Sequence, residues 1–142
     1  MAVGLGPLPT LHPVPGFQLG IASAGIKRPG RKDVVIMRLA EGAQIAGVTT
    51  TNAFCAAPVL LTRERLQGDV RYLLTNTGNA NAGTGAEGLA NARRTCAALA
   101  ALSGVDECAV LPFSTGVIGE PLPVAKIESA LQAALDDLNE DH

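Results

Sequence analysis

Apolar positions recur along this chain in short stretches, and their spacing changes from a strand type to a helix type. Residues 33–39, DVVIMRL, are rich in β-branched side chains and predict a strand. Residues 17–26 have strand character weakened by glycines, and residues 45–51 have the composition of a third strand. Because short glycine-containing turns separate these stretches, the first part of the chain predicts an antiparallel meander.

The rest of the chain predicts strands followed by glycine-rich loops and helices. Apolar runs at residues 70–75 and 109–114 have strand length, and a glycine-rich loop follows each of them. Apolar residues spaced by three and four predict helices over residues 86–102 and 124–138. A proline suited to a first helical turn predicts a shorter helix at residues 58–66. This order of elements indicates the α/β (α+β) class.

The two ends of the chain differ from this pattern. Residues 1–16 contain four prolines, which predict an extended arm because proline fixes φ and lacks a backbone donor. The chain ends in DDLNEDH, which has the composition of a helix end with no strand after it. We therefore expect residues 1–142 to form a single domain that is incomplete.

Composition narrows the function classes. Of the 142 residues, 47% are hydrophobic and 17% are charged, which suits a packed core rather than a disordered segment. Aromatic residues make up only 3% and the net charge is −2, so we expect no nucleic-acid partner. The basic residues of the stretch 27–32 are interrupted by a Pro-Gly pair, which predicts a solvated turn. No apolar run approaches the roughly 18 residues of a membrane helix, so we expect no membrane association.

The three cysteines are Cys55, Cys96 and Cys108, and no CxxC spacing occurs among them. An odd number without that spacing predicts neither a metal site nor a disulfide framework. Cys96 lies on the apolar face of a predicted helix, where a small core residue is expected. We therefore expect a soluble protein of a reducing compartment, the cytoplasm.

No complete set of catalytic residues is recognisable. The only histidines are His12, in the proline-rich arm, and His142, the last residue, and neither suits a general base. Cys55 has no obvious histidine partner, and no GxSxG elbow is present. Asp136 and Asp137 lie at a predicted helix end, where solvated carboxylates are expected.

The first glycine-rich loop is NTGNANAGTG, residues 76–85. Its small residues allow close approach of the backbone, and the N–H groups at the start of the following helix favour negative charge. It matches neither the P-loop nor the GxGxxG pattern. Because its asparagines can also form Asx-turns, a functional and a purely structural role both remain open.

The second glycine-rich loop is STGVIG, residues 114–119. Thr115 offers a hydroxyl donor and Gly116 offers a backbone N–H, and two adjacent donors can converge on one oxygen. Acyl transfer needs such a pair, because each donor to the oxyanion of a tetrahedral intermediate is worth about 2.7–4 kcal/mol. The alternative is a tight turn before a helix that begins after two prolines.

The loop sequences NTGNANAGTG and PFSTGVIGEPLP closely resemble the bifunctional ornithine acetyltransferase / N-acetylglutamate synthase family of arginine biosynthesis. The stretches FQLGIASAGIKRPGRKDVVIMRL and TTTNAFCAAPV are similar to the N-terminal region of the same family. The resemblance extends over essentially the whole chain, and the two loop motifs together are specific. It implies a layered sheet core flanked by helices, the fold that these enzymes share with related self-cleaving aminopeptidases.

The resemblance also implies an activity. Members of the family transfer an acetyl group from N2-acetylornithine to glutamate, without a bound cofactor, and some accept acetyl-CoA as a substrate. Their precursor cleaves itself before a threonine, which becomes the first residue of the downstream beta chain. That threonine is the nucleophile, with its own amine as base, and the reaction is ping-pong. Two alpha and two beta chains form a heterotetramer.

The resemblance assigns roles to residues of both loops. It implies that Thr115, through its hydroxyl, and Gly116, through its N–H, form the oxyanion hole. Other positions of the two loops are expected to shape the site: Asn76, Gly78, Asn79, Asn81 and Ser114. Because the nucleophile and the substrate-binding residues are expected downstream, we expect the isolated chain to be inactive.

Two other functions are compatible with the sequence. One is a related self-cleaving aminopeptidase, against which the two loop motifs argue. The other is a non-catalytic module that binds anions or nucleotides with its glycine loops, and such a module would bind phosphate without a partner.

Overall fold

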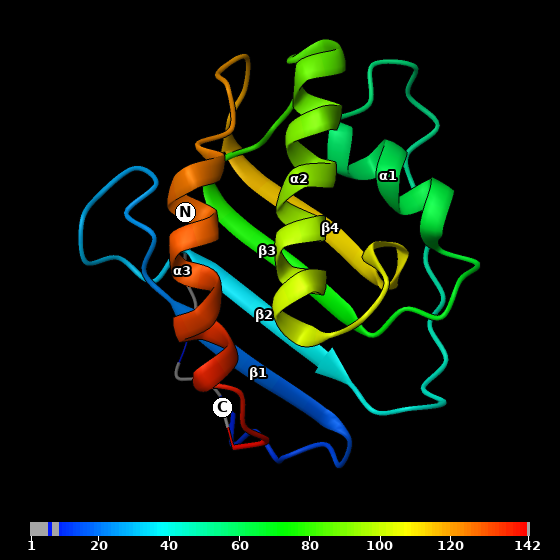
Figure 1. The fold of residues 1–142 in the computed structure, drawn as a ribbon, viewed down its shortest axis with the longest axis vertical. Helices are drawn as coiled ribbons and strands as arrows, with labels where there is room; N and C mark the ends of the chain where they lie inside the picture. The colour runs from blue at the N-terminus through cyan, green and yellow to red at the C-terminus, as the bar shows by residue number, and fades with distance from the viewer. Residues whose placement is uncertain (1–5, 7–8, 142) are drawn as a thin grey trace.

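The computed structural model describes residue 6 and residues 9–141. Figure 1 shows one sheet with helices packed on it, and its elements follow one another in this order: β1 (Phe17–Ala22), β2 (Val34–Leu39), α1 (Ala57–Arg65), β3 (Tyr72–Asn79), α2 (Gly85–Ser103), the 3-10 turn η1 (Glu107–Ala109), β4 (Val110–Val117) and α3 (Val124–Asp136). The mixed α/β class predicted from the sequence is confirmed.

The sheet has the strand order β1-β2-β3-β4. β1 pairs antiparallel with β2, and β2 pairs antiparallel with β3. β3 and β4 are parallel, because α2 returns the chain to the end of the sheet at which β3 began. The carboxyl ends of β3 and β4 therefore meet at the same edge of the sheet, and both glycine-rich segments begin there.

The three α-helices cover one face of the sheet (Figure 1). α3 packs on β1 and β2, α1 packs on β4, and α2 lies between the two other helices. Alternate residues of the strands face these helices, and most of those in the middle of the sheet are buried, as strand alternation predicts. The side chains at the centre of this core come from all the layers: Val34, Ile36, Leu61, Leu74, Cys96, Leu99, Val110, Ile127 and Leu131. Cys96 is thus a core residue, as predicted.

The opposite face of the sheet is also apolar. Strand alternation and register place the following side chains on it: Phe17, Leu19, Ile21, Val35, Met37, Leu39, Leu73 and Phe113. These residues are only partly buried, and Phe113 is 40% exposed, whereas Leu111 on the same face is fully buried. Residues 44–49 cross this face near Leu39, Leu73 and Phe113 and line a cavity with them. We refer below to this second face of the sheet as the open face.

The sequence predicted three features of this fold wrongly. Residues 45–51 form no strand, and part of this segment lies instead across the open face. β3 extends to Asn79 and β4 to Val117, so the first residues of both predicted loops belong to strands. The parallel pairing of β3 with β4 continues through the glycines, which is why the strands do not end before them. Residues 27–32 form an exposed turn, as predicted.

The chain after α3 also differs from the prediction. The helix ends at Asp136, and Asn139 exchanges two backbone hydrogen bonds of 2.9 and 3.0 Å with Leu19 at the edge of β1. Asp136 is exposed, as expected, but the Asp137 carboxylate accepts a 2.9 Å hydrogen bond from the N–H of Ile21. Asp137 is therefore not a merely solvated carboxylate, because it satisfies a donor at an open strand edge.

Candidate functional site

The two glycine-rich segments predicted from the sequence lie side by side in the sheet. Gly78 of β3 is the register partner of Gly116 of β4. A Cβ atom on Gly116 would lie 2.3 Å from the carbonyl carbon of Gly78 and 2.5 Å from the nitrogen of Asn79. Two strands can approach this closely only where the side chain is absent.

The ladder is irregular at this point. Asn79 pairs with both Thr115 and Val117, so the register shifts by a β-bulge. Gly78 has φ +106° and Gly116 has φ +135°, conformations that glycine adopts without the steric penalty of a side chain. Bulges redirect the chain and are frequent beside active sites. Here the bulge places the Thr115–Gly116 pair where the strand is about to leave the sheet.

A buried amide connects the two segments just before the bulge. Asn76 is 4% exposed and is the register partner of Ser114. The Ser114 hydroxyl donates a 2.6 Å hydrogen bond to Oδ1 of Asn76, and Nδ2 of Asn76 donates a 2.9 Å hydrogen bond to the carbonyl oxygen of Asn79. Both ends of the buried amide are therefore satisfied, as burial of a polar group requires.

Two further asparagines fix the segments beyond the strands. Nδ2 of Asn79 donates to the carbonyl oxygens of Glu120 and Pro121, each at 3.1 Å. Oδ1 of Asn79 accepts a 2.8 Å hydrogen bond from the N–H of Asn81. Nδ2 of Asn81 donates to the carbonyl oxygen of Gly88 in α2 at 2.8 Å. Asn76, Asn79 and Asn81 thus hold the ends of β3, β4 and α2 together.

Thr115 lies on the other side of the strand from this network. Strand alternation puts its side chain on the open face with Phe113, whereas Ser114 points toward the helices. Thr115 and Gly116 are both exposed. Among the described residues, the Thr115 hydroxyl has no hydrogen-bond partner. Its hydroxyl is therefore accessible to a group that approaches the open face.

Sequence reasoning missed the neighbours of Thr115 on the open face. Thr77 is its register partner, and Thr75 pairs with Phe113 one step earlier along the strands. All four lie on one face, because they are register partners at alternate positions of two parallel strands. The alternation of the run YLLTNTGN, combined with the parallel pairing, would have identified the two threonines of β3.

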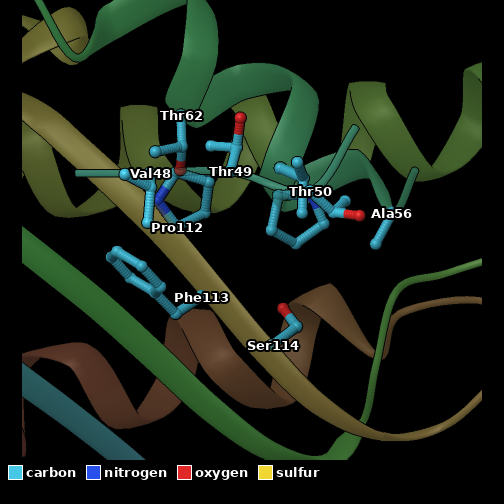
Figure 2. Close-up of a pocket in the computed structure, with 10 residues that line it drawn as sticks. Val48, Thr49, Thr50, Ala56, Thr62, Pro112, Phe113 and Ser114 are labelled. Carbon is cyan, nitrogen blue, oxygen red and sulfur yellow. The ribbon is translucent and has the colours of Figure 1, made fainter. Parts of the chain in front are cut away.

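A cavity of about 300 Å³ lies along the outer edge of β4. Its lining combines strand residues Pro112, Phe113 and Ser114 with the irregular segment 48–50 and the first turns of α1 (Figure 2). The cavity is mostly apolar, with polar groups contributed by hydroxyl side chains such as Thr62. It adjoins the strand end that carries Thr115, although Thr115 does not line it.

A buried carboxylate holds the loop after β1, which packs on Gly78. Asp33 is 3% exposed and accepts hydrogen bonds of 2.6 Å from the N–H of Ala24 and 2.7 Å from that of Ile26. Nζ of Lys126 donates a 2.8 Å hydrogen bond to the carbonyl oxygen of Gly25 in the same loop. This loop packs on Gly78, since a Cβ there would lie 3.0 Å from Cγ2 of Ile26.

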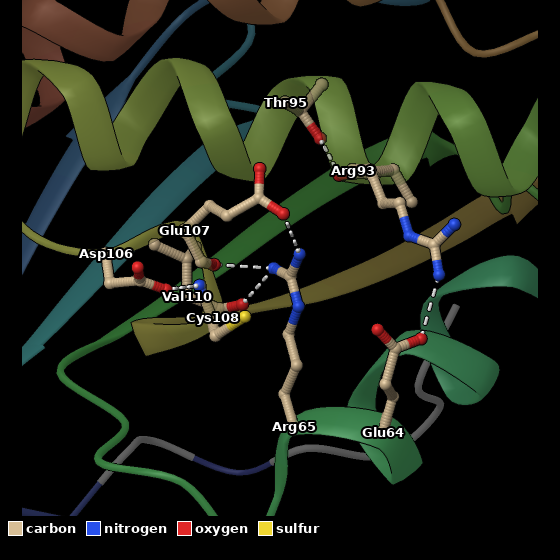
Figure 3. A network of polar contacts seen from close by, with 9 residues as sticks. Glu64, Arg65, Arg93, Thr95, Asp106, Glu107, Cys108 and Val110 are labelled. Atoms are coloured by element: carbon tan, nitrogen blue, oxygen red, sulfur yellow. Dashed lines mark hydrogen bonds and ion pairs between the residues drawn. The ribbon is translucent and has the colours of Figure 1, made fainter.

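The start of β4 is fixed by a buried arginine. Nη1 of Arg65 donates to the carbonyl oxygens of Glu107 at 2.6 Å and Val110 at 3.0 Å, and Nη2 forms a 3.3 Å ion pair with the Glu107 carboxylate (Figure 3). Burial of the neighbouring Cys96 thiol raises its pKa to about 12, so it is not a nucleophile at neutral pH. The cluster is structural, because it lies at the opposite end of β4 from Thr115.

Other candidate groups lie outside the site. His12 is exposed in an irregular segment, and His142 lies outside the described residues. Cys55 is half-buried and Cys108 is exposed. Within the described part of the chain, no group of three or more His, Cys, Asp or Glu residues could hold a metal ion. The same residues include no helix with the length and hydropathy to cross a bilayer.

Comparison with known proteins identifies the family. The profile of the ArgJ family matches residues 18–142. The chain is 78% identical over its whole length to the arginine biosynthesis bifunctional protein ArgJ of Pseudomonas syringae pv. tomato, of which it covers 35%. It is 56% identical over 131 residues to the protein of the same name from Methylococcus capsulatus, covering 92% of the chain and 32% of that protein. The chain thus spans about a third of the length of these relatives.

Solved structures show the same fold. The ornithine acetyltransferase of Mycobacterium tuberculosis, complexed with ornithine, superposes with a TM-score of 0.84 at 35% identity, over 90% of this chain and 69% of that chain. The arginine biosynthesis bifunctional protein ArgJ of Bacillus halodurans superposes with a TM-score of 0.75 at 33% identity, over 89% of this chain and 71% of that chain. The resemblance inferred from the two glycine-rich motifs is confirmed, and this chain belongs to the ArgJ family.

Proposed function

We propose that the protein containing this chain transfers an acetyl group from N2-acetylornithine to glutamate in arginine biosynthesis, as a glutamate N-acetyltransferase. The observation that carries the proposal is the exposed Thr115–Gly116 pair at the end of β4, where the Thr115 side chain lies on the open face. Family membership supports the proposal, as does the fold shared with an ornithine acetyltransferase. The Thr115 hydroxyl and the Gly116 N–H act as the oxyanion hole.

The first half of the reaction forms an acetyl-enzyme. The hydroxyl oxygen of a threonine that begins the downstream chain attacks the acetyl carbonyl carbon, and its proton passes to the α-amine of the same threonine. The carbonyl oxygen becomes an oxyanion, which accepts hydrogen bonds from Thr115 and Gly116. When the intermediate collapses, the bond between the acetyl carbon and the ornithine nitrogen breaks. That nitrogen takes up the proton from the α-amine of the threonine, and ornithine leaves.

The second half reverses these steps with another amine. The amine of glutamate attacks the acetyl-threonine carbonyl, the same two donors stabilise the second oxyanion, and the threonine oxygen leaves with a proton. The products are N-acetylglutamate and the regenerated enzyme. If acetyl-CoA is accepted as an alternative acetyl donor, the same steps release its thiol as the leaving group. No bound cofactor takes part in the proposed reaction.

The open face supports a partner chain. Its apolar side chains on β1, β2 and β3 are only partly buried, and a sheet that is apolar on both faces is stabilised when both are covered. The partner is the downstream beta chain, which brings its threonine to Thr115 when it covers this face. Two such pairs form a heterotetramer.

The compartment that we propose is the cytoplasm, where the three free thiols would stay reduced.

The experiment that tests this function compares the full-length protein with residues 1–142 alone. Release of ornithine and formation of N-acetylglutamate are measured with N2-acetylornithine and glutamate, while mass spectrometry monitors self-cleavage. We expect activity and parallel double-reciprocal plots from the full-length protein, and none from residues 1–142. A folded, self-cleaved protein without acetyl transfer would rule the function out. Assays with acetyl-CoA and with peptide substrates then separate bifunctional acetyl transfer from aminopeptidase activity.

A further inference from the structure

Asn76 occupies an unusual position for a polar side chain. It projects from the inner strand β3 toward the helix layer, on the face where Tyr72 and Leu74 form part of the core. Only 4% of its surface is exposed, so its amide has lost its contact with water. A buried amide costs stability unless its donors and acceptor are bonded, and an apolar residue would avoid that cost.

The hydrogen bonds of Asn76 define which way its amide points. The carbonyl oxygen of Asn79 can only accept, so the atom of Asn76 that lies 2.9 Å from it must be Nδ2. Oδ1 is then the atom that faces Ser114, and the Ser114 hydroxyl must donate to it, at 2.6 Å. The hydroxyl proton of Ser114 is therefore used in this hydrogen bond. Ser114 donates to Asn76, and Asn76 in turn donates to the backbone of Asn79.

Both ends of this chain of bonds reach the proposed oxyanion hole. Ser114 immediately precedes Thr115 in β4. Asn79 follows Gly78, the residue against which Gly116 packs. On the far side of the pair, the N–H of Ala80 donates a 2.8 Å hydrogen bond to the carbonyl oxygen of Val117. The Thr115–Gly116 segment is therefore held at both ends by bonds to β3 and the residue that follows it.

The bulge explains why such a support is needed. The regular ladder ends where Asn79 pairs with two residues of β4, and Gly78 and Gly116 have no side chains to fix their conformation by packing. Backbone at such a site is held by the hydrogen bonds around it. Donors of an oxyanion hole must stay within about 0.5 Å of the productive geometry, and a misplacement of about 1 Å can lower the rate by roughly 100-fold.

We propose that Asn76 and Ser114 are positioning residues for the Thr115–Gly116 oxyanion hole, through the bond from the Ser114 hydroxyl to Oδ1 of Asn76 and the bond from Nδ2 of Asn76 to the Asn79 carbonyl. In this role neither residue donates to the oxyanion itself. The inference rests on the proposed acetyl transfer. Their loss displaces the donors from the transition-state oxygen and leaves ground-state binding intact, so it lowers kcat and leaves KM nearly unchanged.

The test uses the full-length protein, four single variants described here, and Thr115→Ala with and without Ser114→Ala. Ser114→Ala removes the donor to Asn76, whereas Ser114→Thr keeps a hydroxyl. Asn76→Asp keeps an acceptor for Ser114 but removes the donor to Asn79. Thr95→Val is the matched control, because the Thr95 hydroxyl is also buried and bonded, at 3.0 Å to the carbonyl oxygen of Ala92, but lies in α2 away from the site.

We expect Ser114→Ala and Asn76→Asp to lower kcat by roughly 10- to 100-fold with less than about a 3-fold change in KM. Ser114→Thr should recover most of kcat, and Thr95→Val should keep it. Ser114→Ala should also have a smaller effect in a Thr115→Ala background, because residues that act through one group are not additive.

The outcomes separate the two proposals. If the unmutated protein transfers no acetyl group, both the proposed function and this inference are overturned. If the unmutated protein is active and the Ser114 and Asn76 variants keep its kcat, the inference alone is overturned. Effects that are fully additive with Thr115→Ala, or a loss in Thr95→Val equal to that in Ser114→Ala, would show a general structural role and would also overturn it.

Discussion

Gly116 lies so close to Gly78 that a Cβ atom on Gly116 would be 2.3 Å from the Gly78 carbonyl carbon. That atom belongs to the backbone, so no side-chain rotation can relieve the clash. The φ angle of +135° at Gly116 is also one that side-chain-bearing residues rarely adopt. The Thr115–Gly116 pair thus keeps its place in the sheet only while position 116 is glycine.

Gly116→Ala should therefore destabilise the full-length protein and abolish most of its acetyl transfer. Backbone strain alone costs about 1–3 kcal/mol, and separation of β3 from β4 adds to this. The thermal unfolding midpoint and kcat of the soluble variant are the measurements. Gly119→Ala is the control, since Gly119 has φ +80° but no atom within 4 Å of the position that a Cβ would take. Equal losses in both variants would contradict the close-approach argument.

Thr115→Ala should lower kcat by roughly 100- to 1,000-fold, because one of two oxyanion donors is lost. KM should change little, since the hydroxyl acts mainly on the transition state. In this chain Thr115 is exposed and its hydroxyl bonds to none of the described residues, so loss of this small group should change the unfolding midpoint little. Steady-state kinetics with N2-acetylornithine and glutamate check this, and near-normal kcat in the folded variant would remove Thr115 from the role.

Sequence patterns were sufficient where local periodicity decides the structure. The spacing of Cys96 and Leu99 with their apolar neighbours predicted the buried face of α2, and both residues are fully buried. Gly104 ends that helix in a left-handed conformation, with φ +69°, as a glycine after a helix commonly does. Helix periodicity and its termination are local properties, so the sequence alone contained them.

Sequence patterns failed where pairing between residues far apart in the chain determines the structure. The hydrogen bond between Ser114 and Asn76 joins residues 38 positions apart, and nothing in either loop sequence indicates it. Thr115 was expected in a loop but lies in β4, because pairing with β3 extends the strand past its glycines. Residues 45–51 have strand composition but lie in an irregular segment, part of which lines a cavity against the open face, and composition cannot distinguish these two outcomes.

Gly20→Ala should destabilise the fold without acting on the site. A Cβ atom there would lie 1.9 Å from the backbone carbonyl oxygen of Ala134, so α3 must move away from β1. Overpacking of this kind costs about 1–3 kcal/mol, which should appear as a lower unfolding midpoint with kcat per folded molecule retained. Gly47→Ala is the matched control, because its nearest neighbour is a flexible Leu66 methyl group at 3.4 Å. Equal midpoints for the two variants would contradict the packing of α3 on Gly20.

The Cys96 thiol should make stability fall at alkaline pH. Burial raises its pKa from 9.0 to about 12, so between these values the native state keeps a proton that the unfolded chain has lost. The free energy of unfolding therefore decreases as the pH rises through this window, and the contribution is complete below pH 9.0. Denaturant unfolding under reducing conditions, compared with a Cys96→Ala variant, should show a smaller decrease in the variant. Cys108, whose pKa is raised by its hydrogen bond with Asp106, is present in both proteins and cancels.

Alkylation provides an independent check of the same burial. At alkaline pH, iodoacetamide should modify the exposed Cys108 in the native protein and should reach Cys96 only after denaturation, because the thiolate is the reactive form and Cys96 is buried. Modification of Cys96 at the rate of Cys108 would mean that α2 separates from the sheet in the native state. The pH dependence of stability would then have another origin, because a thiol that is open to solvent has no reason to keep its proton above its ordinary pKa.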